Sequence, residues 1–97
     1  TGDFIEAEEA YRIGYIDVLV EEGEHLARAL TLAARMTRWS PVSLRLAKDA
    51  IRAAYEMPLG KGLVYEKERF LDAFASEDGR EGVTAFVEKR KPDFKGR

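Results

Sequence analysis

Four consecutive segments of this chain each place their apolar residues on one side of a helix. The sets are Leu26, Leu30, Ala33 and Met36; Leu44, Ala47, Ile51, Ala54 and Tyr55; Leu59, Leu63, Phe70 and Phe74; and Val83, Phe86 and Val87. The four side chains of the third set fall within about 60° on a helical wheel at about 100° per residue. The pattern predicts a mainly α-helical chain in which every helix has a single apolar face to cover.

Start and stop signals separate these segments. Ser40 can accept a hydrogen bond from a free backbone N–H, and Pro41 at the first helical position loses no hydrogen bond. Pro58 is predicted to end that helix, because the residue before a proline is pushed out of the helical region. Ser76 is predicted to cap the last helix and Pro92 to end it.

The N-terminal part has a different pattern. Residues 6–13 have helical spacing and stop at Gly14, while residues 15–20 alternate with Ile16, Val18 and Val20 on one side, as in a short half-buried strand. A single strand leaves its backbone groups unpaired unless a partner strand comes from outside the chain. Together with an opening that lacks an initiator Met, this favours a piece of a larger protein.

Length and composition restrict the class further. A chain of 97 residues buries only about 60–65% of the surface that its unfolded form exposes, so a partner surface is expected. There is no cysteine, which leaves no disulfide, thiolate zinc site or thiol nucleophile and suits the cytoplasm. The apolar runs are far shorter than the roughly 20 residues that span a bilayer, so no membrane association is expected.

Charge is unevenly distributed although the net charge is only -2. Residues 1–24 hold eight acids against Arg12, whereas the C-terminal end has Lys89, Arg90, Lys91, Lys95 and Arg97 against Asp93. A basic tail can meet phosphates, but a solvated helix end explains it equally well. A nucleic-acid binder should carry more positive helices with interleaved aromatic residues, so no nucleic-acid partner is expected.

No catalytic or metal-binding constellation is visible. His25 is the only histidine and lacks acids at ligand spacing, while Ser40 and Ser76 are accounted for as helix caps. Glu66 shares a helical sector with Leu63 and Phe70, which predicts a salt-bridged interface or packing residue ahead of a catalytic one.

The order of short motifs resembles the crotonase family of enoyl-CoA hydratases and isomerases. Its run "TG, A-x-EA, GLV-x-x-VV" is matched by Thr1-Gly2-Asp3, by residues 7–11 and by residues 14–20, with Tyr15 where Leu is commoner. Ser40-Pro41 with Ala47-Lys48 is similar to "SP-x-A-x-x-x-x-K". Residues 76–94 are similar to the ending "SED-x-x-EG-x-x-AF-x-EKR-x-P-x-F". The match covers essentially the whole chain.

The resemblance implies a fold and an assembly. Residues 1–20 would be the end of the crotonase core, a spiral of β-β-α units that binds an acyl-CoA thioester, and residues 21–97 the C-terminal helical trimerisation region. Homo-oligomers of this family are trimers, often paired into hexamers. The backbone N–H groups and glutamates of the reaction lie upstream in the family, so the resemblance implies no catalytic residue here and no cofactor besides acyl-CoA as substrate.

The resemblance also implies one ligand-binding pair. Phe86 and Lys89 match the aromatic and the lysine by which the last helix of one subunit reaches the CoA nucleotide held by its neighbour. A ring can stack on adenine and an ammonium can meet a phosphate. Ordinary helix packing for Phe86 and a solvated helix end for Lys89 are the alternatives. Hydratase versus isomerase activity and acyl-chain length depend on residues outside this sequence.

A second hypothesis is an autonomous helical protein-interaction module without enzymatic activity. Such a module would also carry apolar faces larger than short helices can bury among themselves. It does not explain the predicted lone strand.

Overall fold

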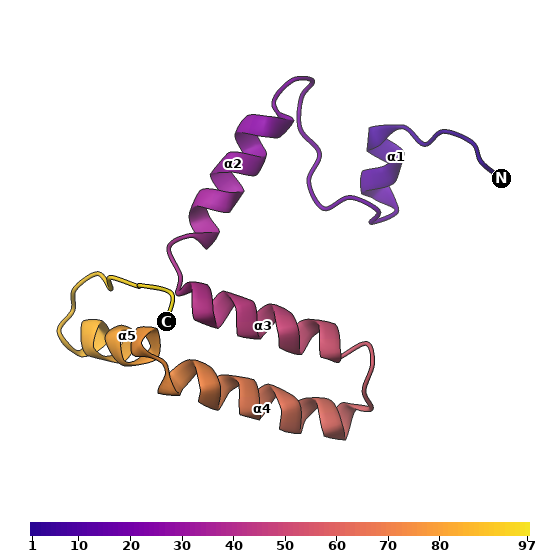
Figure 1. Ribbon diagram of the computed structural model, residues 1–97. Coiled ribbons are helices and arrows are strands. Elements are labelled where there is room, and N and C mark those ends of the chain that lie inside the picture. The colour runs from indigo at the N-terminus through magenta and orange to yellow at the C-terminus, as the bar shows by residue number, and fades with distance from the viewer. The chain divides into compact units, whose positions relative to one another are not determined.

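The computed structural model describes all residues 1–97, and its regular structure is entirely helical (Figure 1). The helices are α1 (Ala7–Arg12), α2 (His25–Met36), α3 (Pro41–Ala53), α4 (Leu59–Ala75) and α5 (Glu77–Val87). The chain divides into two compact units, residues 1–35 and residues 36–97. None of the helices has the length and apolar character needed to cross a membrane.

Helix α1 begins and ends on local signals. Its first turn carries Glu8 and Glu9, acids that suit the positive end of a helix. Glu9 accepts two hydrogen bonds of 2.6 Å from Arg12 one turn later. At the C-terminal end Gly14 takes a left-handed conformation with φ 76°. The N–H of Tyr15 then donates to the Ala10 carbonyl at 2.8 Å, which closes the helix in a Schellman motif.

The prediction of a strand over residues 15–20 is wrong. This segment is irregular, and Tyr15, Val18 and Leu19 are exposed. A strand is held by hydrogen bonds to a second strand, and no other extended segment of this chain pairs with it. The alternation of apolar and polar residues over residues 15–20 therefore does not produce a strand within these 97 residues.

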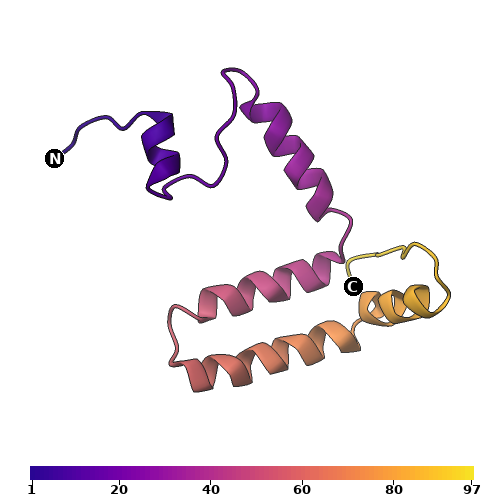
Figure 2. The same ribbon diagram turned by 180° about the vertical axis from the view of Figure 1, so that it is seen from behind.

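In the second unit α3 and α4 run antiparallel as a hairpin, and α5 follows α4 at a sharp corner (Figures 1 and 2). The predicted caps are confirmed: Ser40 Oγ accepts from the Ser43 N–H at 3.2 Å, and Ser76 Oγ accepts from the Gly79 N–H at 2.9 Å. Residues 88–97 turn back along α5, so that the C-terminus returns to the start of α3 (Figure 2).

Two helix ends differ from the prediction. Helix α3 ends at Ala53, and a turn precedes Pro58. Helix α5 ends at Val87, well before Pro92, because Lys89 adopts a left-handed φ of 56° and reverses the chain. In both cases the helix stops before it reaches the proline.

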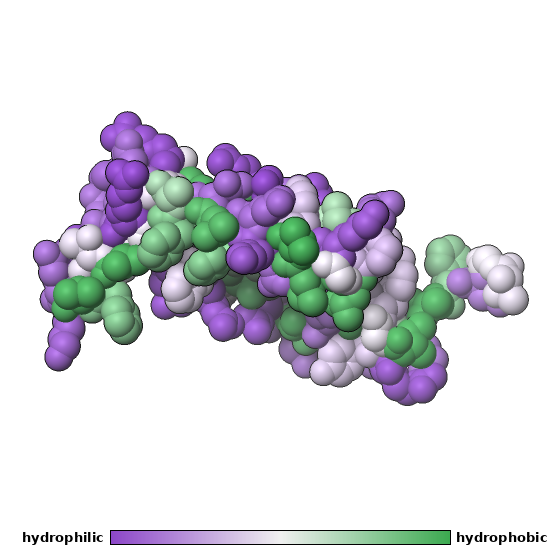
Figure 3. All heavy atoms as spheres, turned by 90° about the horizontal axis from the view of Figure 1, so that it is seen from below, coloured by the Kyte–Doolittle hydropathy of each residue, from purple (hydrophilic) through white to green (hydrophobic).

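The predicted apolar faces form but stay uncovered. Only Ala10, Val42 and Ala85 are buried apolar residues, and hydrophobic side chains lie open at the surface in Figure 3. The exposed members of the predicted sets include Leu26, Leu30, Met36, Leu44, Ile51, Leu59, Leu63, Phe70, Phe74, Val83, Phe86 and Val87. Monomeric proteins rarely expose so much apolar surface.

We expect the 97-residue chain alone to self-associate or to melt with poor cooperativity, because its apolar faces are open to solvent. Sedimentation velocity at several concentrations, together with calorimetry, would measure both properties. A monomer that melts in one sharp transition would contradict this expectation.

Any side chain in place of Gly79 at the α4–α5 corner is predicted to lower the stability of the second unit. A Cβ at this position would lie 2.4 Å from the Ala73 carbonyl oxygen and 2.6 Å from that of Phe74. Gly79→Ala should therefore destabilise the second unit by roughly 1–3 kcal/mol, as overpacking does. The matched control is Gly60→Ala in α4, where a Cβ meets nothing within 4 Å and helix propensity favours alanine. Urea unfolding followed by circular dichroism compares the two variants, and equal midpoints would contradict the prediction.

Candidate functional site

The C-terminal tail, residues 88–97, is fixed to the start of α5 by a buried carboxylate. Asp78 is 2% exposed and accepts hydrogen bonds from Ser40 Oγ at 2.7 Å, from the Lys95 N–H at 2.7 Å and from the Gly96 N–H at 3.0 Å. Its own N–H donates to the carbonyl of Arg97 at 2.9 Å. One side chain thus joins the start of α3, the start of α5 and the tail.

The hydrogen bonds keep Asp78 ionised. Burial acts to raise the pKa of this carboxyl, but hydrogen bonds from Ser40 and from the backbone of Lys95, Gly96 and Arg97 outweigh burial and lower the pKa. The role of Asp78 is structural, and we assign it no chemistry.

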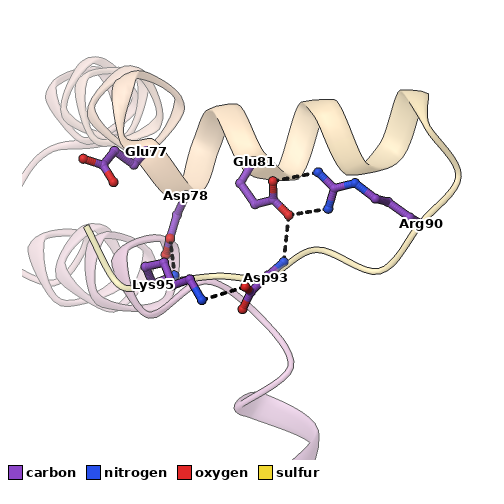
Figure 4. A pocket seen from close by; sticks show the side chains of 6 residues that line it. All are labelled: Glu77, Asp78, Glu81, Arg90, Asp93 and Lys95. Carbon is purple, nitrogen blue, oxygen red and sulfur yellow. Dashed lines mark hydrogen bonds and ion pairs between the residues drawn. The ribbon is translucent and has the colours of Figure 1, made fainter.

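A second set of contacts, the Glu81–Arg90–Glu88 clamp, holds the turn after α5, and Figure 4 shows its Glu81–Arg90 part. Arg90 donates Nη1 to Glu81 Oε1 at 2.6 Å and Nη2 to Glu81 Oε2 at 2.8 Å, and its Nε donates to Glu88 Oε2 at 2.6 Å. The Asp93 N–H also donates to Glu81 Oε1, at 2.8 Å. The Arg90 guanidinium and then the Asp93 N–H lower the pKa of Glu81 to about 2, and both carboxylates raise the pKa of Arg90.

The predicted ligand-binding residues lie at this end of α5. Phe86 is in the last turn of the helix and is 85% exposed. Lys89 is exposed at the point where the chain reverses. Within this chain the Phe86 ring stacks on no other ring, and the Lys89 ammonium has no ion-pair or hydrogen-bond partner. The structure brings the two residues to one helix end and leaves both of their functional groups unoccupied.

Beside this helix end an open apolar groove runs over α3, α4 and α5, with a volume of about 1010 Å³. Its aromatic lining consists of Trp39, Phe70, Phe74, Phe86 and Phe94. The rings of Phe70 and Phe74 stack with centroids 6.1 Å apart. Glu66 also lines the groove, but it is exposed and forms no salt bridge within this chain.

Trp39 and Phe94 also line the groove, and the sequence pattern did not predict this, because neither residue lies on the apolar face of a predicted helix. Phe94 approaches the groove from the tail, where its ring lies 3.5 Å from the position of a Cβ on Gly82. Phe94 reaches the groove only because the C-terminal tail folds back along α5, and the apolar pattern of the individual helices does not predict this reversal. His25 begins α2 as an exposed residue, and no group of three or more metal-ligating side chains occurs in the structure.

The α3–α4 hairpin carries a further polar cluster. Tyr65 donates its hydroxyl to Asp49 at 2.6 Å, and this hydrogen bond raises the pKa of Tyr65. The Arg69 guanidinium lies over the Tyr65 ring at 4.8 Å and pairs with Asp72 at 3.0 Å. These contacts stabilise the α3–α4 hairpin, and we assign them no role in binding a substrate.

Comparison with known proteins gives a consistent match over this whole arrangement. The family model described as enoyl-CoA hydratase/isomerase matches residues 1–97. The chain is 41% identical over 97 residues to a 2,3-dehydroadipyl-CoA hydratase of Escherichia coli, which covers all of this chain and 38% of that protein. It is 37% identical over 98 residues to a short-chain-enoyl-CoA hydratase of Clostridium acetobutylicum, again 38% of that protein.

Solved structures agree in geometry. The chain superposes on an enoyl-CoA hydratase from Mycobacterium tuberculosis with a TM-score of 0.90 and 31% identity, covering all of this chain and 38% of the other. For an enoyl-CoA hydratase from Geobacillus kaustophilus the TM-score is 0.90 and the identity 34%, over 99% of this chain and 36% of the other. The chain thus spans a little over a third of the length of the proteins it matches.

Acid should release the tail. The pKa of Glu81 falls from an ordinary 4.5 to about 2 in the folded chain, so the contribution of this carboxylate to stability is complete above about pH 4.5 and is lost as the pH falls toward 2. Amide exchange at Asp93, whose N–H donates to Glu81, should accelerate over this range. Glu81→Gln should show fast exchange at every pH.

The control for this titration is Glu77→Gln, which removes only the exposed pair with Arg97 at 2.8 Å. This variant should keep the acid-dependent release at Asp93. If the wild-type exchange rate at Asp93, corrected for intrinsic pH dependence, stays flat between pH 5 and roughly pH 2, Glu81 does not control the tail.

Proposed function

The chain belongs to the enoyl-CoA hydratase/isomerase family, the crotonase family that its motifs resemble, and from this we propose that it is the C-terminal helical part of an enzyme acting on acyl-CoA thioesters. The fold class predicted from the sequence, a helical portion of the crotonase-type fold, is confirmed by the structural neighbours. Water addition to an enoyl-CoA double bond, or a shift of that bond, is the reaction proposed for the whole protein.

We propose that this part supplies no catalytic residue. The reaction of such enzymes needs N–H donors for a developing enolate and a carboxylate that moves protons. Among the carboxylates described above, Asp78 and Glu81 are fully engaged in holding the tail. Glu66 is exposed to solvent, where nothing fixes it against a reacting atom. These observations support the proposal of a binding and assembly role for residues 21–97, with the chemistry of the parent enzyme carried by residues outside this sequence.

The observation that carries the binding role is the free pair at the end of α5. Phe86 is 85% exposed and has no ring partner, and the Lys89 ammonium is unpaired. An adenine ring stacks well on an exposed aromatic side chain, and a phosphate attracts an ammonium as a point charge. We propose that the two residues form one edge of an acyl-CoA site whose remainder belongs to a neighbouring subunit.

The uncovered apolar faces support the second role, subunit contact. Aromatic and aliphatic residues line a groove of about 1010 Å³, and apolar residues on α2 are exposed as well. Surfaces of this kind are typical of homo-oligomer interfaces. We propose a homo-oligomer, a trimer or a hexamer, as the working state of the parent.

The proposal also covers the cofactor, the partners and the location of the parent enzyme. No cofactor is proposed beyond the acyl-CoA substrate, and neither a membrane nor a nucleic acid is proposed as a partner. The absence of cysteine supports a cytoplasmic location. The alternative function, an autonomous helical interaction module, draws on the same exposed apolar faces but leaves the free Phe86 and Lys89 pair without a role.

The ligand role is tested in the full-length parent with Lys89→Ala. Loss of one unpaired ammonium from a phosphate contact should weaken CoA binding about three- to tenfold by isothermal titration, as charge-assisted contacts at a partly exposed site do. The matched control is Lys91→Ala, which removes the same charge two residues away and should change affinity less than about twofold. Unchanged affinity in the Lys89 variant would remove this residue from the site.

A further inference from the structure

Two helices of this chain end in the same motif but with different residues at its critical position. In α1 the left-handed residue is Gly14, with φ 76°, and the N–H of the next residue donates to Ala10 at 2.8 Å. In α5 the left-handed residue is Lys89, with φ 56°, and the Arg90 N–H donates to Ala85 at 3.0 Å. Glycine is the usual residue here because a Cβ makes the left-handed conformation strained.

Lys89 is the only residue other than glycine with positive φ in the whole chain. Strain of this kind persists only where surrounding contacts enforce it, and such positions gather at functional sites. A glycine would close the helix at lower cost. The position therefore keeps a side chain for a reason other than helix termination.

The contacts that span Lys89 are those of the Glu81–Arg90–Glu88 clamp. The residues on either side of Lys89 are joined to each other, since Arg90 Nε donates to Glu88 Oε2 at 2.6 Å. The bidentate contact of Arg90 with Glu81 then ties this bridge to the body of α5. Paired N–H donors meeting both oxygens of one carboxylate fix orientation as well as distance.

The same contacts leave Lys89 as a free cation. Arg90 is neutralised by Glu81 and Glu88, Lys95 pairs with Asp93 at 2.6 Å, and Arg97 pairs with Glu77 at 2.8 Å. Of the five cations in the tail and its turn, only Lys89 and Lys91 have ammonium groups without a partner. Lys89 is the one held in a fixed backbone conformation three residues from the exposed Phe86 ring.

We propose that the Glu81–Arg90–Glu88 clamp is a positioning device, which holds the backbone of Lys89 in its left-handed conformation so that the lysine side chain leaves the helix end from a preset position and can reach the phosphate of a CoA nucleotide stacked on Phe86. This inference rests on the proposed ligand role of Phe86 and Lys89. Glu81 and Arg90 touch no ligand in it; they act through Lys89. A contact that is preset before binding gains affinity because less conformational freedom is lost on binding.

The test uses the full-length enzyme and two substrates, an acyl-CoA and the matching acyl-pantetheine thioester, which lacks the nucleotide. Arg90→Gln and Glu81→Gln keep Lys89 but break the bidentate contact. Each should raise KM for the acyl-CoA about two- to tenfold and leave the KM for the acyl-pantetheine thioester within about twofold. A merely structural role would change both substrates alike. Glu77→Gln, outside the clamp, should change neither.

A double-mutant cycle separates this inference from the ligand role. If the clamp acts through Lys89, then Glu81→Gln should have no further effect on acyl-CoA KM in a Lys89→Ala background. A full additional loss there would overturn the inference. If Lys89→Ala alone has no effect, the ligand role fails instead. If Lys89→Ala raises KM but the clamp variants do not, the ligand role stands and the positioning role is refuted.

A milder variant keeps the test valid if Arg90→Gln or Glu81→Gln misfolds. Glu88→Gln breaks only the bridge across Lys89, at a side chain that is 55% exposed. It should raise the acyl-CoA KM by up to about threefold. Lys89→Gly gives an independent readout, because it should raise the melting temperature by relieving the strain while weakening the acyl-CoA interaction. A lower melting temperature, or an unchanged acyl-CoA KM, in this variant would count against the proposal.

Discussion

The arrangement of α3, α5 and the tail in the second unit, residues 36–97, depends on one buried carboxylate. Asp78 is the only large side chain that is fully buried, and a carboxylate without partners in that position would be strongly destabilising. Its acceptors are filled by Ser40 and by backbone N–H groups of the tail. The start of α3, the start of α5 and the C-terminus are therefore fixed relative to one another by hydrogen bonds, with almost no apolar core beneath them.

A unit held in this way leaves its apolar surface available. Helix boundaries are set by caps, by Gly79 at the α4–α5 corner and by the left-handed turn at Lys89, and none of these devices consumes the apolar faces. The groove over α3, α4 and α5 consequently stays open with its aromatic rings exposed. The residues that fix the internal geometry are therefore different from those that form the apolar surface, which is what the proposed role in subunit contact requires.

Contacts between residues close together in the sequence were predictable, whereas contacts between distant residues were not. The caps at Ser40 and Ser76 were predictable because each hydroxyl meets an N–H three residues away. The irregular structure of residues 15–20 was not predictable from their alternating pattern, since a strand forms only where a second strand pairs with it. The burial of Asp78 was equally hidden: the sequence shows a first-turn acid, whereas its partners Lys95 and Gly96 lie 17 and 18 residues further on.

The basic tail shows why a count of charges was a weak guide to function. Five cations against Asp93 suggest a phosphate-binding surface of some kind, but α5 itself supplies most of the missing anions through Glu77 and Glu81. What remains is not a diffuse positive patch. Two ammonium groups, those of Lys89 and Lys91, stay unpaired, and Lys89 has a left-handed backbone at the helix end that carries the exposed Phe86, which is the arrangement on which the proposed nucleotide contact rests.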